Sequence, residues 1–86
     1  MTENELKILG FEKMEVSAEE SGDKSFYYYV YEFTKGLEFI TQDSDNVEND
    51  KWWVEFFNTD ISIRFHDFME VQNLISIFEK AKVKTK

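Results

Sequence analysis

The sequence contains no cysteine and no proline, and it has only three glycines and one histidine. Without cysteine there is no disulfide framework, no thiolate zinc site and no cysteine nucleophile. The three glycines are not clustered, so the sequence has no glycine-rich loop of the phosphate-cradling type. His66 has no glycine-flanked serine to activate, so no nucleophilic triad can be assigned. The sequence therefore predicts a protein that is not an enzyme and holds no cofactor.

Long hydrophobic runs are also lacking. The longest uncharged stretches, residues 25–31 and 71–78, are far too short to cross a bilayer. The first five residues are acidic and are not followed by an apolar run, unlike a signal peptide. We therefore expect a cytoplasmic protein with no membrane contact.

Positive charge is scarce in most of the chain. The net charge is −8, and residues 1–60 carry 15 acidic but only five basic side chains. A negative surface repels nucleic-acid phosphates, which argues against direct nucleic-acid binding. It favours a basic partner, including the basic groove of a nucleic-acid-binding protein. The alternative is that the charge only keeps a small protein in solution.

Aromatic residues, in contrast, are abundant at 17% of the chain. In residues 26–33 and 51–57 the rings occupy odd and even positions alike. Because a strand points successive side chains to opposite faces, one core cannot accept all of these rings. Either a second layer covers the other face of the sheet, or an aromatic surface remains for a partner.

Capping patterns predict one helix at each end of the chain. Thr2 and Glu5 have the capping-box spacing, and Gly10 is a stop signal, which indicates a helix of about two turns. Asp67 and Glu70 have the same spacing before a second helix. The apolar residues of this second helix form one stripe: Phe68, Val71, Leu74, Ile75 and Phe78.

Alternating apolar patterns predict the strands. We expect strands at 11–16, 26–33, 37–41, 51–57 and 61–65, with loops at 17–25 and 42–50. The fold class is α+β: an antiparallel meander of about four to five strands, with a short N-terminal helix and a C-terminal amphipathic helix packed on one face. Residues 1–86 form a single domain. We expect Lys82–Lys86 to be a frayed basic tail.

The pairing of the two strands in the last predicted hairpin can be inferred from the sequence. A two-residue loop at Thr59-Asp60 pairs Val54 with Phe65 and Phe56 with Ile63, and sets Glu55 opposite Arg64 on the other face. A four-residue loop gives the same faces with the pairs shifted by two. The residues expected to face the core are Val54, Phe56, Ile61, Ile63 and Phe65.

The two adjacent tryptophans must then diverge. Trp52 shares the parity of Val54 and points inward, whereas Trp53 points outward together with Phe57. On residues 26–33, one of two alternating sets joins the inner face. We expect Tyr27, Tyr29 and Tyr31 to lie with Trp53 and to anchor a protein partner. The alternative is that the N-terminal helix and the first strand cover this face.

Residues 43–50 form an acidic loop. Its carboxylates could bind a hard cation, but Val47 and Glu48 break the EF-hand pattern, so we favour a solvated loop. In the binding hypothesis, its acidic side chains mimic phosphates on a basic partner: Asp43, Asp45, Glu48 and Asp50.

Three segments carry a resemblance. The opening run 5–13, the tyrosine-rich strand and Trp52-Trp53-Val54-Glu55 resemble small uncharacterised proteins of bacterial phages and mobile elements. The small, acidic, cysteine-free and aromatic-rich character is also similar to that of phage-borne inhibitors of bacterial defence, including anti-CRISPR proteins. The resemblance implies no activity and assigns no functional residue.

These observations support three hypotheses. The first is a non-enzymatic inhibitor or adaptor that binds a protein, such as the basic nucleic-acid groove of a host defence nuclease. The second is a structural protein that uses its aromatic face as a homodimer interface. The third is a binder of sugars or small ligands on Trp53 and the tyrosines, which is weaker because no concave pocket can be inferred.

Overall fold

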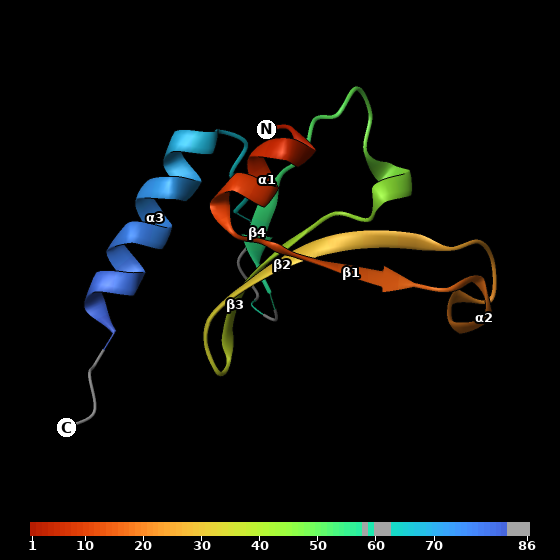
Figure 1. The fold of residues 1–86 in the computed structure, drawn as a ribbon, viewed down its shortest axis with the longest axis horizontal. Helices are drawn as coiled ribbons and strands as arrows, with labels where there is room; N and C mark the ends of the chain where they lie inside the picture. The colour runs from red at the N-terminus through yellow and green to blue at the C-terminus, as the bar shows by residue number, and fades with distance from the viewer. Residues whose placement is uncertain (58, 60–62, 83–86) are drawn as a thin grey trace.

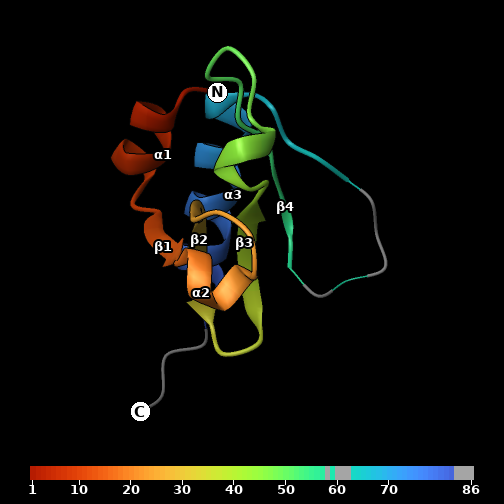
Figure 2. The ribbon, with the colours of Figure 1, turned by 90° about the vertical axis from the view of Figure 1, so that its right-hand side faces the viewer.

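A four-stranded antiparallel sheet with two helices on one side forms the body of the protein (Figures 1 and 2). The computed structural model describes residues 1–57, 59 and 63–82. The strands follow one another in the sheet in chain order, so the predicted α+β meander is confirmed. The elements are α1 (Glu3–Leu9), β1 (Glu12–Val16), α2 (Ala18–Ser21), β2 (Phe26–Thr34), β3 (Leu37–Thr41), the 3₁₀ turn η1 (Ser44–Asn46), β4 (Val54–Phe56) and α3 (Phe68–Ala81).

The N-terminal helix α1 begins and ends where its sequence signals lie. Thr2 Oγ1 accepts a hydrogen bond from the Glu5 amide at 3.2 Å, and Glu5 Oε1 accepts one from the Thr2 amide at 2.8 Å. Gly10 ends the helix with φ +98°, a left-handed conformation that glycine adopts without a Cβ penalty. The predicted capping box and stop are confirmed.

The helix α2 was predicted as loop, and this prediction is wrong. Ser17 and Glu20 form the same reciprocal capping box as in α1, and Gly22 again supplies the left-handed end. The helix is only four residues long and stands at the tip of the β1–β2 hairpin (Figure 1). It buries no residue, so its caps rather than its packing hold it in place.

The strand β4 is shorter than the predicted strand 51–57. A side chain replaces the backbone ladder before Val54: Gln42 Oε1 accepts from the Trp53 amide at 2.9 Å, and Gln42 Nε2 donates to the Lys51 carbonyl at 3.2 Å. This glutamine is buried at the end of β3. It ties the two ends of the 42–51 loop together where the strand pairing stops.

The predicted fifth strand, 61–65, is reduced to a single bridge in the described residues. Phe65 pairs with Val54 through hydrogen bonds of 2.9 and 2.7 Å, which confirms one of the two pairs predicted for a two-residue loop. Ile63, however, is 49% exposed, so its expected place in the core is wrong. Because the pairing at Phe65 is a single bridge, it does not fix which way the side chain of Ile63 points. Ile61 lies outside the described residues.

The C-terminal helix α3 begins after Asp67, as predicted, although the Asp67 side chain makes no capping hydrogen bond. Its apolar stripe packs on the sheet: Val71 is fully buried, and the Phe78 ring lies 5.0 Å from that of Phe33 and 6.0 Å from that of Phe56. Among the described residues, none of the helices has both the length and the apolar character needed to span a bilayer.

Candidate protein-binding surface

The strand register divides the aromatic residues between two faces of the sheet. We call the face under α1 and α3 the inner face, because it carries the buried core. Cross-strand partners share a face, and the inner pairs include Tyr31 with Phe39 and Phe39 with Phe56. The core residues of this face and its helices are Leu6, Phe11, Tyr29, Phe33, Phe39, Trp52, Val54 and Val71.

The tyrosines expected beside Trp53 lie on the inner face instead. Tyr29 is only 1% exposed, and its ring packs edge-on against Trp52 with the centroids 5.5 Å apart. Tyr27 and Tyr31 are half-buried and pack against the same core. The assignment of these three tyrosines to the face of Trp53 is therefore wrong. The alternative set on β2, which contains Tyr28, takes that position.

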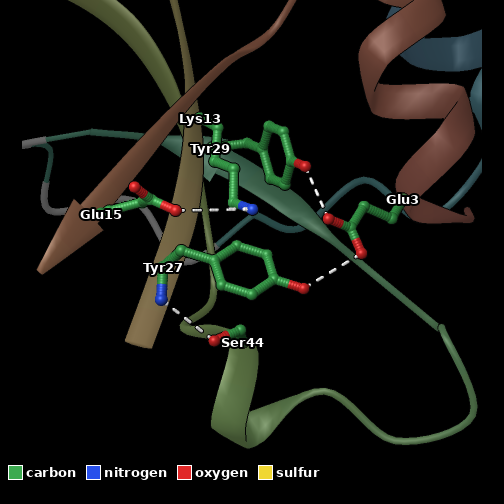
Figure 3. Close-up of polar contacts among 6 residues, drawn as sticks. All are labelled: Glu3, Lys13, Glu15, Tyr27, Tyr29 and Ser44. Carbon is green, nitrogen blue, oxygen red and sulfur yellow. Dashed lines mark hydrogen bonds and ion pairs between the residues drawn. The ribbon is translucent and has the colours of Figure 1, made fainter. Parts of the chain in front are cut away.

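Two of these tyrosines attach α1 to the sheet through one carboxylate (Figure 3). The Tyr29 hydroxyl donates to Glu3 Oε2 at 2.6 Å, and the Tyr27 hydroxyl donates to Glu3 Oε1 at 3.1 Å. Burial, reinforced by the hydrogen bond to Glu3, raises the pKa of both hydroxyls above the usual value. The arrangement keeps both phenols protonated and fixes the helix, so it is structural.

Tyr31 makes the equivalent contact with the other helix. Its hydroxyl donates to Glu79 Oε2 on α3 at 2.9 Å, and burial together with this bond raises its pKa. Lys82 lies 2.9 Å from Glu79 Oε1, and the hydrogen bonds from Lys82 and Tyr31 lower the pKa of Glu79. The three tyrosines thus orient the two helices on the inner face.

The opposite face of the sheet carries Trp53 and is not covered by α1 or α3. Side chains alternate along each strand, so every second residue counted from Met14, Tyr28 or Trp53 points to this face. We call this surface the outer face; its apolar residues are Met14, Val16, Phe26, Tyr28, Val30, Ile40, Trp53 and Phe57. Met14 and Phe57 are exposed, at 39% and 48% respectively. A hollow of about 180 Å³ lies among five of these apolar residues: Met14, Tyr28, Val30, Ile40 and Phe57.

Three glutamates border one end of the outer face. Glu32 and Glu38 are direct cross-strand partners, and Glu12 joins them around a single hollow. None of the three forms an ion pair within the described part of the chain. Like charges directly opposite each other in a sheet are destabilising. The outer face is therefore an apolar surface with unneutralised negative charge at its edge.

One cation does lie on the outer face. The Arg64 guanidinium stands 4.1 Å from the centre of the Trp53 ring, and Arg64 Nε lies 3.8 Å from Glu55 Oε2. The predicted pairing of Glu55 with Arg64 opposite each other on this face is confirmed. The assignment of Trp52 to the core is also confirmed, since Trp52 is 2% exposed.

The acidic loop does not act as one unit. Asp50 Oδ1 accepts hydrogen bonds from the Glu3 amide and from Trp52 Nε1, both at 3.0 Å, so it braces α1 and the core. Asp43 precedes η1 and is partly buried, whereas Asp45 and Glu48 are exposed. Across the described residues, no three carboxylate or histidine side chains are grouped so as to hold a metal ion.

Sequence reasoning missed most of the outer face, although one signal was present. Phe26, Tyr28 and Val30 have the same parity as Glu32, whereas the other set on β2 ends in Phe33. A glutamate on the same side of the strand as one set of residues indicates that this set faces solvent. Comparison of the chain with protein-family models, with curated proteins and with solved structures finds no match.

Proposed function

We propose that this chain is a non-enzymatic, cytoplasmic protein-binding module whose outer face binds a basic protein. The observation that carries the proposal is the combination, on one surface, of exposed apolar and aromatic side chains with three glutamates that form no ion pair among the described residues. Large aromatic side chains are enriched among the residues that dominate binding energy at interfaces. The glutamates select the partner, because charge complementarity excludes acidic surfaces and accelerates encounter with basic ones.

The narrower form of the proposal concerns the kind of partner. A basic nucleic-acid groove, such as that of a host defence nuclease, combines positive charge with exposed apolar and planar contacts. The acidic outer face is complementary to such a groove, and the resemblance in character to phage-borne inhibitors, including anti-CRISPR proteins, points the same way. In this form, Asp43, Asp45 and Glu48 contribute additional negative charge beside the groove, whereas Asp50 is excluded by its internal hydrogen bonds.

A homodimer formed through the outer face is the second candidate, favoured by its apolar area. Charge opposes it. Across a two-fold axis the same surface meets itself, so Glu12, Glu32 and Glu38 of one copy approach the acidic surface of the other. If the outer face nevertheless pairs with a second copy, unfolding becomes concentration-dependent, which a free binding face does not produce.

The test compares two charge reversals of equal size in the full chain. Glu38→Lys changes the outer face, while Glu19→Lys makes the same change on α2, where the side chain is exposed and forms no ion pair within the described residues. Each protein is immobilised and exposed to a bacterial lysate at low and at raised salt, and the bound proteins are quantified by mass spectrometry.

We expect the unmodified chain and Glu19→Lys to retain the same basic protein, and Glu38→Lys to lose it. Raised salt should release it, because it screens contacts between exposed charges. Equal capture by all three proteins would contradict the proposal. Circular dichroism of Glu38→Lys provides the folding control, and we expect a native spectrum because the change removes the repulsion between Glu32 and Glu38.

A further inference from the structure

The outer face already holds one guanidinium group, that of Arg64. Trp53 supplies the ring face, 4.1 Å from the Arg64 guanidinium carbon, and Glu55 supplies a carboxylate oxygen 3.8 Å from Nε. A cation on an aromatic face beside a carboxylate is the chemistry by which proteins recognise arginine. We propose that the partner inserts an arginine side chain between Trp53 and Glu55, in the place that Arg64 holds in the free protein. This inference rests on the proposed function.

The contacts of Arg64 are suited to displacement. Its side chain is 55% exposed, and its distance to Glu55 lies near the upper limit for an ion pair. Exposed ion pairs of this kind contribute little to stability. The neighbouring residue Phe65 is held by its two backbone hydrogen bonds to Val54. The Arg64 side chain can therefore leave the ring while the backbone bridge stays in place.

A second trio of a cation, an aromatic ring and a carboxylate can be compared with the trio of Arg64, Trp53 and Glu55. Lys13 Nζ stands 4.1 Å from the centre of the Tyr27 ring and 3.7 Å from Glu15 Oε2 (Figure 3). That trio lies on the inner face, where the Tyr27 hydroxyl is bound to Glu3. Of these two groups, the one at Trp53 adjoins the apolar surface that α1 and α3 leave uncovered. The difference in position, rather than in contact geometry, marks the Trp53 site as the one available to a partner.

The surroundings favour arginine over lysine. A guanidinium is planar and weakly hydrated, so it can stack on an indole ring and donate to a carboxylate at the same time. The half-buried Ile40, cross-strand partner of Glu55, supplies adjacent apolar surface. Glu38 lies on the same face of β3 and forms no ion pair within the described part of the chain, so it can receive a second cation of the same partner. The outer face thus fits an arginine-rich segment better than a lysine-rich one.

The experiment uses hexa-arginine and hexa-lysine peptides as probes of the full chain, with dissociation constants measured by calorimetry at physiological salt. Arg64→Ala vacates the Trp53 site, and Lys13→Ala is the matched control, because it removes an equal charge from the trio on the inner face. Trp53→Ala removes the ring. Circular dichroism establishes that each variant is folded.

We expect Arg64→Ala to bind hexa-arginine about two- to fivefold more tightly than Lys13→Ala, which corresponds to the ~0.5–1 kcal/mol of an exposed cation–π contact. Trp53→Ala should abolish the preference for hexa-arginine over hexa-lysine. Equal affinities for Arg64→Ala and Lys13→Ala overturn the arginine site. In that case, weaker binding by Glu38→Lys than by Glu19→Lys leaves the proposed function standing, while no difference between these two overturns both.

Discussion

Replacing each of the two adjacent tryptophans by alanine should have opposite consequences. Trp52 is 2% exposed, packs against the rings of Tyr27 and Tyr29 and donates its indole N–H to Asp50. Removing a buried aromatic side chain of this size costs about 3–5 kcal/mol. Since small domains are stable by only about 5–15 kcal/mol, Trp52→Ala should remove a large fraction of the total.

Trp53→Ala should cost far less. Its ring is half-buried on the outer face, and its identified partner is Arg64, so the loss is about the 0.5–1 kcal/mol of an exposed cation–π contact. For a domain of this size, 1 kcal/mol corresponds to about 4–8 °C in Tm. Trp52→Ala should therefore lower the Tm by more than about 12 °C, and Trp53→Ala by less than about 8 °C.

Urea unfolding followed by far-ultraviolet circular dichroism measures both losses without relying on the fluorescence of the replaced residue. The unmodified chain is the reference. If the two variants lose equal free energies of unfolding, Trp53 is packed as tightly as Trp52. The outer face would then be part of a core, and the binding proposal would lose its basis.

Three further predictions concern the fold. The free energy of unfolding of the unmodified chain should fall as the pH rises above about 10, the usual pKa of tyrosine. Above that pH the unfolded chain loses the Tyr29 proton while the folded chain still holds it, because the folded structure raises the pKa of this hydroxyl. Tyr29→Phe should flatten this fall, and an unchanged slope would contradict the prediction. Gly10→Ala should destabilise by about 1 kcal/mol because φ is +98°, while its Cβ would meet Tyr31 at an acceptable 3.5 Å; unchanged urea unfolding would contradict this strain. Glu38→Lys should raise the Tm relative to Glu19→Lys, since only the former relieves a cross-strand repulsion, and an equal Tm would show that none exists.

Much of the fold follows from local signals. The box of Thr2 and Glu5, the stop at Gly10 and the parity that separates Trp52 from Trp53 depend on residues close together in the chain, and all are confirmed. The pairing of Val54 with Phe65 is also confirmed. The parity of Arg64 limited the register to even shifts, and the observed bridge selects the one expected for a two-residue loop.

The errors arise where tertiary contacts decide. The choice of face for β2 depends on where the helices pack, and Glu3 on α1 binds Tyr27 and Tyr29 from the inner side. The short strand β4 depends on Gln42, whose side chain replaces the backbone pairing. The helix α2 was missed for a different reason: Ser17 begins a capping box, but no apolar stripe follows it.

The candidate binding surface could be predicted only in part. Trp53, Phe57 and the pairing of Glu55 with Arg64 were expected on the exposed face. The other members of the outer face come from three separate strands, so the sequence alone did not bring them together. The three glutamates at its edge were hidden among many acidic residues, and only the register makes Glu32 and Glu38 direct neighbours.

The most direct test of the outer face is a nuclear magnetic resonance titration of the ¹⁵N-labelled full chain with the hexa-arginine peptide. The two tryptophans give separate indole N–H signals, and they report on opposite faces of the sheet. We expect the Trp53 indole signal and the amides of Glu38 and Ile40 to shift, while the Trp52 indole signal stays in place. Shifts confined to the amides of residues 43–50, with the Trp53 signal unchanged, would contradict the assignment of the outer face as the binding surface.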